Sequence, residues 1–396
     1  MALNYIDQAD LSGKVVIARF DFNVPLNKED RSEITDTTRI DNALETINYI
    51  LSNGAKKLIL MSHLGRPKGE RNMDFTLEPV ATYLASKLGE DVILSESCTD
   101  RGIKTLLGLN ESKVILLENL RFHAEETSND RDFAKTLANY ADIYVNDAFG
   151  AAHRKHASTY GINEFFKNKA YAGFLIKNEL QALEKVVGNA QKPFVAIVGG
   201  AKVSDKIKII EKLLRSVDSL LIGGAMAYPF LKAKGLNVGK SLCTDEDVSL
   251  AKRILNDKTS HKIILPVDHI TSKDFGGMPE LVNQEEIPED FMGLDIGPRT
   301  RELYEAKIKE AKTVLWNGPM GLFENKDFAE GSFSIAKALA ESNAFTLIGG
   351  GDSVSAVNQS GLSSKMSHIS TGGGASLEYI ENGSLPGIQA LKFGVN

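Results

Sequence analysis

The stretch TLIGGGDSVSAV (346–357) combines the features that decide the fold of this chain. An apolar run ends in three consecutive glycines, a carboxylate follows directly as Asp352, and the next residues have helical spacing. A strand, a tight turn and a helix in this order are typical of α/β proteins with parallel sheets. Because three glycines give up side-chain packing, we expect something to approach this backbone closely.

Similar short apolar runs recur along the chain. They are continuous rather than alternating, as in strands that are covered on both faces. Helical patterns lie between them: in residues 37–54, Ile40, Leu44, Ile47 and Leu51 form one stripe, and Gly54 ends it. Strands are expected at 14–20, 57–63, 113–119, 142–148, 193–200, 219–224, 262–268, 313–318 and 345–350.

The chain has 396 residues, which is too long for one ordinary core. The first four strands end in charged residues and the later ones in glycine, which predicts two doubly wound parallel-sheet domains. The expected boundaries are 1–170 for the first domain, 171–188 for a helix that joins the two, and 189–383 for the second domain. A helical pattern without proline suits this junction better than a loose linker.

Composition excludes several classes of function. The formal net charge of −6 argues against nucleic acid as the main partner. No apolar run has transmembrane length, and the first residues lack the pattern of a signal peptide, so we expect a cytoplasmic protein without a membrane partner. Cys98 and Cys243 stand apart, outside any C-x-x-C, which fits a reducing compartment and gives no thiolate metal site.

Glycine-rich strand ends suit the phosphate chain of a nucleotide. Exposed N–H groups and helix N-termini stabilise anions, and glycine lets a phosphate approach. Asp352 then offers one carboxylate to Mg²⁺, which often uses one or two protein carboxylates together with phosphate oxygens. The alternative is a glycine turn in which Asp352 only caps a helix. Several such clusters at successive strand ends favour the nucleotide, and glycines recur at 199–200, 223–224, 318–321 and 372–374.

Two lysines follow the first of these clusters. Lys206 heads an apolar stripe continued by Ile210, Leu213 and Val217, so we expect its side chain on the sheet side of the helix. Lys202 lacks this placement. Most helical lysines are solvated, and this alternative stays open for both.

The charged strand ends suit a small anion with more than one acid group. Arginine presents a planar fork of donors that matches phosphate and carboxylate. Each arginine alone is more often a surface ion-pair partner, but their recurrence after successive strands favours a binding site. The strand ends carry Arg19 and Asp21, and the candidate ligands of the anion are Arg39, His63, Arg66, Arg121 and Arg154.

Nine motifs in this order resemble those of the phosphoglycerate kinase family over essentially the whole chain. They are RFDFNVP (19–25), LMSHLGRP (60–67), LLENLRFH (116–123), YVNDAFGAAHR (144–154), GGAKVSDKI (199–207), GLDIGP (293–298), WNGPMGLFE (316–324), GGGDS (349–353) and STGGGASLE (370–378). The resemblance implies a two-domain α/β kinase of glycolysis, a transferase with a carboxyl group as acceptor. It also implies a cytoplasmic, hinge-bending monomer whose residues 384–396 return to the first domain.

The family's reaction is the reversible, Mg²⁺-dependent transfer of a phosphoryl group from 1,3-bisphosphoglycerate to ADP, which gives 3-phosphoglycerate and ATP. By resemblance, the residues of the 3-phosphoglycerate site are Asp21, Phe22, Asn23, Arg39, His63, Leu64, Gly65, Arg66, Arg121 and Arg154. Those of the nucleotide site are Gly200, Ala201, Lys206, Gly224, Gly293, Asn317, Glu324, Gly349, Gly350, Gly351, Asp352 and Ser353, with Asp352 as the metal ligand. The transition-state clamp is Arg39, Lys202, Lys206, Gly372, Gly373 and Gly374.

Two rival functions remain at this stage. A kinase acting on another acid, such as acetate, would not need four arginines, because acetate has no second anionic group. A binding protein that closes on a small anion would not need Lys206, Asp352 and a second, glycine-rich site.

Overall fold

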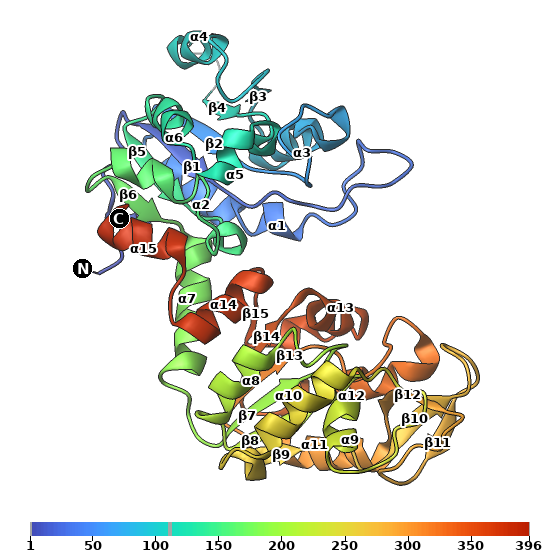
Figure 1. Ribbon diagram of the computed structural model, residues 1–396. Coiled ribbons are helices and arrows are strands. Elements are labelled where there is room, and N and C mark those ends of the chain that lie inside the picture. Colours follow the sequence, from blue (N-terminus) through green and yellow to red (C-terminus); the bar gives the residue numbers. More distant parts are fainter. Residues whose placement is uncertain (1, 110–112, 396) are drawn as a thin grey trace. The chain divides into compact units, whose positions relative to one another are not determined.

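The computed structural model describes residues 2–109 and 113–395 and contains two compact units. The first unit comprises Met1–Gln181 with Ser384–Asn396, and the second comprises Ala182–Gly383. The outermost residues of the predicted domains, 1 and 396, lie outside the described residues. Each unit is built on a six-stranded parallel sheet with helices around it (Figure 1), so the predicted α/β fold class is confirmed.

The sheet of the first unit has the strand order β3-β4-β2-β1-β5-β6, with all neighbours parallel. Arg19 at the end of β1 pairs with Met61 on one side and with Asn146 on the other, so three strands end at the same level. The strands are β1 (Val15–Arg19), β2 (Lys57–Met61), β3 (Val92–Leu94), β4 (Val114–Leu116), β5 (Ile143–Asn146) and β6 (Ala170–Ala172).

The helices of this unit pack on the sheet through their apolar faces, which are thereby buried. In the segment 37–54, Ile40, Ile47 and Ile50 are fully buried in the core, but the segment forms two helices rather than one. The helices are α1 (Thr38–Asp41), α2 (Leu44–Ser52), α3 (Glu78–Leu88), α4 (Gly102–Gly108), α5 (Ala124–Ser128) and α6 (Arg131–Ala138).

The sheet of the second unit has the order β15-β14-β13-β7-β8-β9 and is also parallel. Every residue of β7 and β13 is buried, which explains their continuous apolar sequences. The strands are β7 (Phe194–Val198), β8 (Ser219–Ile222), β9 (Ile263–Ile264), β13 (Thr313–Asn317), β14 (Phe345–Gly349) and β15 (His368–Ile369).

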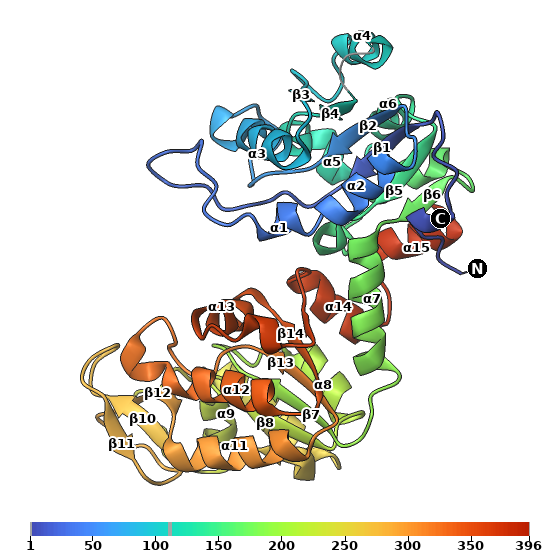
Figure 2. The ribbon, with the colours of Figure 1, turned by 180° about the vertical axis from the view of Figure 1, so that it is seen from behind.

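Seven helices surround this sheet among the described residues; Figure 2, the view from behind, labels all of them except α10, which Figure 1 labels. They are α8 (Ile207–Leu214), α9 (Ala227–Ala233), α10 (Asp245–Leu255), α11 (Pro298–Glu310), α12 (Glu330–Glu341), α13 (Gly351–Gln359) and α14 (Gly374–Asn382).

The sequence did not predict a small antiparallel sheet with the order β11-β10-β12. Its strands are β10 (His269–Ser272), β11 (Glu280–Val282) and β12 (Met292–Ile296). The predicted strand 262–268 is reduced to the two residues of β9. Pro266 follows closely, and proline cannot donate a hydrogen bond to a strand ladder.

The helix expected at 171–188 begins later than predicted. Residues Ala170–Ala172 pair with β5 as β6, and the helix, α7, extends over Phe174–Val187. An apolar run next to a helix gives no signal for where pairing stops, which is why the start was misplaced.

The C-terminal segment returns to the first unit, as predicted. Helix α15 (Pro386–Phe393) contacts β6, and the N–H of Gly387 donates to the carbonyl of Ala152 at 2.8 Å.

Candidate functional site

The first unit contains a cluster of cationic and imidazole side chains beyond the carboxyl ends of β1, β2 and β5. We call Arg19, Arg39, His63, Arg121, Arg154 and His156 the cationic cluster. Burial and the charges of Arg19 and Arg154 lower the pKa of Arg121 to about 10. Burial, followed by the charges of Arg19, Arg121 and Arg39, lowers the pKa of His63 well below its usual value. These mutual effects show that the members lie close together.

Arg19 lies at the base of the cluster and is almost completely buried. Its Nε donates to Ser158 Oγ at 2.9 Å, its Nη1 donates to the carbonyl of Phe20, and its Nη2 lies 2.9 Å from His63 Nδ1. The last residue of a central strand thereby orients the ring of His63 at the end of the neighbouring strand.

Hydrogen bonds fix the loops on which the other predicted ligands lie. Arg39 donates to the carboxylate of Asp21 at 2.7 Å. The side-chain oxygen of Asn23 accepts the N–H of Gly65, and the carbonyl of Gly65 accepts Nη1 of Arg121. Gly65 has φ +62°, a conformation that favours glycine, and a side chain there would collide with Phe75.

The remaining predicted ligands of this site differ in exposure. Arg66 and Arg154 are exposed, and the Nε of Arg154 donates to His153. Phe22 and Leu64 are buried, and their N–H groups already donate to Ser62 and Asn119. Their side chains belong to the core, so a ligand role for either one stays a prediction.

The second unit presents mostly backbone at the equivalent edge of its sheet. Asn317 at the end of β13 pairs with Val198 of β7 and with Gly349 of β14, so three strands end together. A side chain at Gly318 would lie 2.2 Å from the carbonyl oxygen of Gly199, and a side chain at Gly224 would lie 2.8 Å from Pro319 O. These glycines let the three loops pack against one another. We call this region, from Gly199 to Lys206 with Asn317–Gly318 and Gly349–Ser353, the glycine edge.

Lys206 is the half-buried cation of the glycine edge. Its Nζ donates to the carbonyls of Gly199 at 2.8 Å and Asn317 at 3.3 Å, and Ile210 and Leu213 on the same helix are buried in the core. Burial lowers the pKa of Lys206 to about 8, against the opposing charges of Asp352 and Asp205. The side chain therefore lies on the sheet side of α8, where the sequence predicted it.

Asp352 lies in the first turn of α13, with an exposed carboxylate. The helix follows Gly350, which has φ +89°. Ser353 is buried and its Oγ accepts the N–H of Gly318, which ties the helix to the end of β13. Among the described residues, no group of three or more His, Cys, Asp or Glu side chains is placed to hold a metal ion. A metal at Asp352 would therefore need oxygens from a ligand.

The other predicted residues of the second unit fall into two groups. Ala201, Lys202 and Glu324 are exposed. Gly293 lies on β12, where a side chain would collide with the hydroxyl of Tyr228. Gly372 precedes α14, and Gly373 caps it with φ +52°. A side chain at Gly373 or Gly374 would meet no atom within 4 Å, so the space around this helix start is open.

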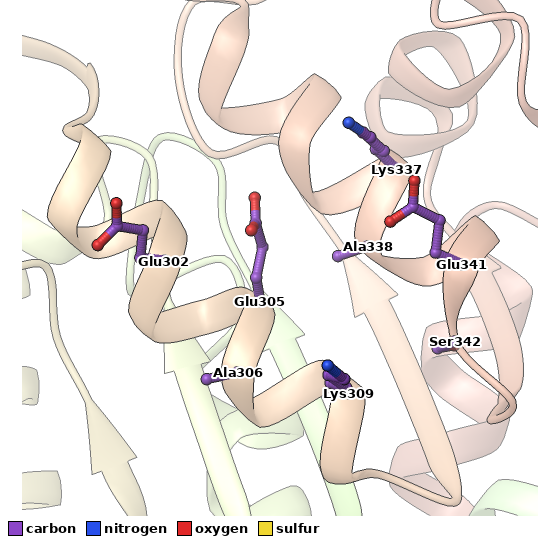
Figure 3. Close-up of a pocket in the computed structure, with 8 residues that line it drawn as sticks. All are labelled: Glu302, Glu305, Ala306, Lys309, Lys337, Ala338, Glu341 and Ser342. Carbon is purple, nitrogen blue, oxygen red and sulfur yellow. The ribbon is translucent and has the colours of Figure 1, made fainter.

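A pocket of about 510 Å³ in the same unit lies elsewhere (Figure 3). It is formed by the second halves of α11 and α12, which lead into the first residues of β13 and β14. It is therefore at the amino ends of these strands, opposite to the glycine edge. Its charged side chains are three carboxylates and two ammonium groups: Glu302, Glu305 and Lys309 from α11, and Lys337 and Glu341 from α12.

Comparisons with known proteins identify the family of the chain. The family model described as phosphoglycerate kinase matches residues 6–383. The chain belongs to the phosphoglycerate kinase family. The enzyme of this name from Anaeromyxobacter sp. (strain Fw109-5) is 53% identical over 99% of this chain and 100% of its own, and that from Clostridium perfringens (strain ATCC 13124) is 49% identical over 98% of each.

Solved structures support the same assignment. The structure of phosphoglycerate kinase from Coxiella burnetii has a TM-score of 0.89 at 37% identity and covers 100% of both chains. That from Pyrococcus horikoshii OT3 has a TM-score of 0.84 at 31% identity over 99% of both. The enzyme is therefore a phosphotransferase of glycolysis, with the activity of phosphoglycerate kinases.

Four residues that shape the cationic cluster were not among the predicted ligands of this phosphoglycerate kinase family member: Arg19, Glu126, His156 and Ser158. Arg19 was noted as a charge at a strand end. The signal in the sequence that could have identified Arg19 is a charged residue at the end of an otherwise apolar strand. Ser158 and Glu126 gave no signal, because Ser158 meets Arg19, and Glu126 meets Ser158, only after folding.

Proposed function

We propose that the cationic cluster binds 3-phosphoglycerate and that the glycine edge binds ADP or ATP. The observation that supports this proposal is the chemical contrast between the two regions. Several cations with few compensating acids suit a ligand with two acid groups, and close-packed glycines around a half-buried lysine suit a phosphate chain.

Arg39, Arg66, Arg121 and Arg154 present guanidinium forks to the phosphate and carboxylate of 3-phosphoglycerate, and His63 adds one N–H. Asp21 and Asn23 orient Arg39 and Gly65 by direct hydrogen bonds. Phe22, Leu64 and Gly65 belong to the same substrate site and set the course of its loops.

In the glycine edge, Lys206 contacts the nucleotide phosphates. The buried side-chain oxygen of Asn317 has no hydrogen-bond partner among the described residues, so it is available to a ligand donor. Gly200, Ala201, Gly224, Gly293 and Glu324 form the nucleoside side. The exposed carboxylate of Asp352, which belongs to no group of three or more candidate metal ligands among the described residues, fits a Mg²⁺ ion that completes its shell with phosphate oxygens and water.

The reaction needs positioning and charge stabilisation rather than a general base. The carboxylate of 3-phosphoglycerate has a pKa of roughly 4 and is ionised at pH 7. The transferred phosphoryl group spreads negative charge over three oxygens. Arg39, Lys202, Lys206 and the start of α14 at Gly372–Gly374 balance this charge, and the bound metal ion supplies further charge neutralisation.

In-line transfer requires the reacting oxygen and phosphorus atoms to come within about 3–3.5 Å of each other. Because the two ligands bind to different units, we propose that the units close about α7 during turnover. Small-angle scattering with both ligands should show a smaller radius of gyration than with either alone. An unchanged radius would argue against closure.

The function is tested by following ADP formation from ATP, Mg²⁺ and 3-phosphoglycerate in a coupled assay. We expect turnover that stops without metal or without 3-phosphoglycerate. Acetate in place of 3-phosphoglycerate should give no turnover, and turnover with acetate would favour the rival acid kinase.

We also propose that the enzyme works in the cytoplasm as a monomer. Cys98 and Cys243 form no disulfide within the described chain, in keeping with a reducing compartment. None of the helices among the described residues has the length and apolar character needed to cross a membrane. Sedimentation at working concentration tests the monomer, and a dimer mass would contradict it.

A further inference from the structure

A buried carboxylate lies under the cationic cluster without a part in the mechanism above. Glu126 on α5 is fully buried. Its Oε1 accepts Ser158 Oγ at 2.7 Å, and its Oε2 accepts the N–H of Ser158 at 3.0 Å. Because both oxygens accept hydrogen bonds, the geometry fits the ionised carboxylate.

The hydroxyl of Ser158 connects Glu126 to Arg19. A serine hydroxyl has one hydrogen, and the hydrogen of Ser158 is directed to Glu126 because Arg19 Nε can only donate. Ser158 is also held through its backbone, because the Tyr144 hydroxyl donates a hydrogen bond to the carbonyl of Ser158 at 2.7 Å.

Arg19 uses all three of its nitrogens inside the protein. Nε donates to Ser158, Nη1 donates to Phe20 O, and Nη2 lies next to His63. With 1% of its surface exposed, Arg19 is a support of the cluster rather than a ligand of substrate.

The contact between Arg19 and His63 determines the proton position on the imidazole. Arginine has no acceptor, so at 2.9 Å His63 Nδ1 must accept the hydrogen bond. The ring then carries its hydrogen on Nε2. Burial and the surrounding arginines lower the pKa of His63, which agrees with a neutral ring.

We infer that Glu126 and Ser158 are positioning residues that act through Arg19 and hold His63 as a neutral side chain whose Nε2–H donates to an acid group of 3-phosphoglycerate. The last part of this inference rests on the proposed binding of 3-phosphoglycerate at the cationic cluster. The part about the proton on His63 concerns the ligand-free protein alone.

The first experiment is ¹⁵N NMR of the imidazole nitrogens in the full-length protein at pH 7, with His63 assigned by the signal lost in His63→Gln. We expect an unprotonated Nδ1 and a protonated Nε2. A protonated Nδ1, or an imidazolium ring, would overturn the inference without any variant.

The second experiment compares Ser158→Ala, which removes the hydroxyl, with Ser158→Thr, which keeps it. In Ser158→Ala, we expect a mixture of His63 tautomers and a KM for 3-phosphoglycerate raised about tenfold, with kcat changed less than threefold. Ser158→Thr should restore the wild-type tautomer and KM. Ser128→Ala is the matched control, because its hydroxyl on the same helix as Glu126 is exposed and bonds only to Glu125 O.

The outcomes separate the two parts of the inference. An unchanged tautomer and KM in a folded Ser158→Ala protein would overturn the role of Ser158 and Glu126. A changed tautomer with an unchanged KM would overturn the donor role of His63 and would count against the proposed substrate site, not against the hydrogen-bond chain.

Discussion

The cationic cluster and the glycine edge lie at equivalent places, the carboxyl ends of parallel strands, yet they are built from different chemical groups. In the first unit, the strand ends supply long cationic side chains, and a buried acid, Glu126, supports them from below. In the second unit, the strand ends supply backbone, and a half-buried cation, Lys206, donates hydrogen bonds to carbonyl oxygens.

The difference follows from the ligands proposed for each region. A small acid offers few atoms, so it must be recognised by several charged side chains that reach it. A phosphate chain can be bound by N–H groups and helix starts, which requires that no side chain blocks the approach. Changes in the first unit should therefore alter the affinity for one substrate, and changes in the second should alter nucleotide binding and turnover.

The largest effect is expected for Lys206→Ala. Loss of one preorganised charge that faces the transferred phosphoryl group should lower turnover about 10²–10³-fold. Steady-state kinetics with both substrates saturating measures this effect. Lys208→Ala, at an exposed position of the same helix, is the control and should keep its activity. An unchanged turnover in Lys206→Ala would remove this residue from the clamp.

Arg154→Ala tests the proposed binding of 3-phosphoglycerate in the first unit. Loss of one charge-assisted hydrogen bond, worth about 1.5–3 kcal/mol, should raise the KM for 3-phosphoglycerate roughly 10–100-fold and alter kcat much less. Arg131→Ala is the control, because this arginine forms an exposed ion pair with Glu164 and such pairs contribute little. A fall in kcat alone would contradict a binding role.

Two glycines of the glycine edge should respond in opposite ways to alanine. At Gly318, φ is +100° and the new side chain would lie 2.2 Å from Gly199 O, so we expect a loss of folding stability of about 1–3 kcal/mol or more. At Gly351, the side chain would meet no atom within 4 Å, so stability should be kept while the KM for ATP rises about tenfold. Urea unfolding and ATP kinetics on both variants test this pair. Unimpaired ATP binding in Gly351→Ala would show that phosphate does not approach there.

The smallest effect is a pH dependence that belongs to the second unit only. Burial lowers the pKa of Lys206 to about 8, and the charged ammonium that binds phosphate is the form present below this pKa. We expect kcat/KM for ATP to fall to about half at pH 8 and by up to tenfold per unit above it. The His63 pKa lies well below its usual value, so His63 should cause no change in 3-phosphoglycerate affinity between pH 6 and 7.5. A fall for ATP that persists in Lys206→Ala would assign the pKa to another group.

The sequence was sufficient for the parts of the fold that depend on local pattern. Continuous apolar runs gave the central strands of both sheets, because strands buried on both faces have no polar face to interrupt them. Peripheral strands such as β3 and β6 have only three residues each, and the strands of the antiparallel sheet β10–β12 have only three to five. Their pairing is decided by neighbours far along the chain, so they could not be predicted.

The sequence by itself determined the family, the α/β fold and the residue types at each strand end, because motifs and strand–helix alternation are local properties of the chain. Only the tertiary structure decided which of these residues act on one another. Ser158 is 139 residues from Arg19 and 32 from Glu126, yet the three form one hydrogen-bond chain that ends at His63. Such a chain depends on the side-by-side order of β2, β1 and β5, and no spacing in the sequence records that order.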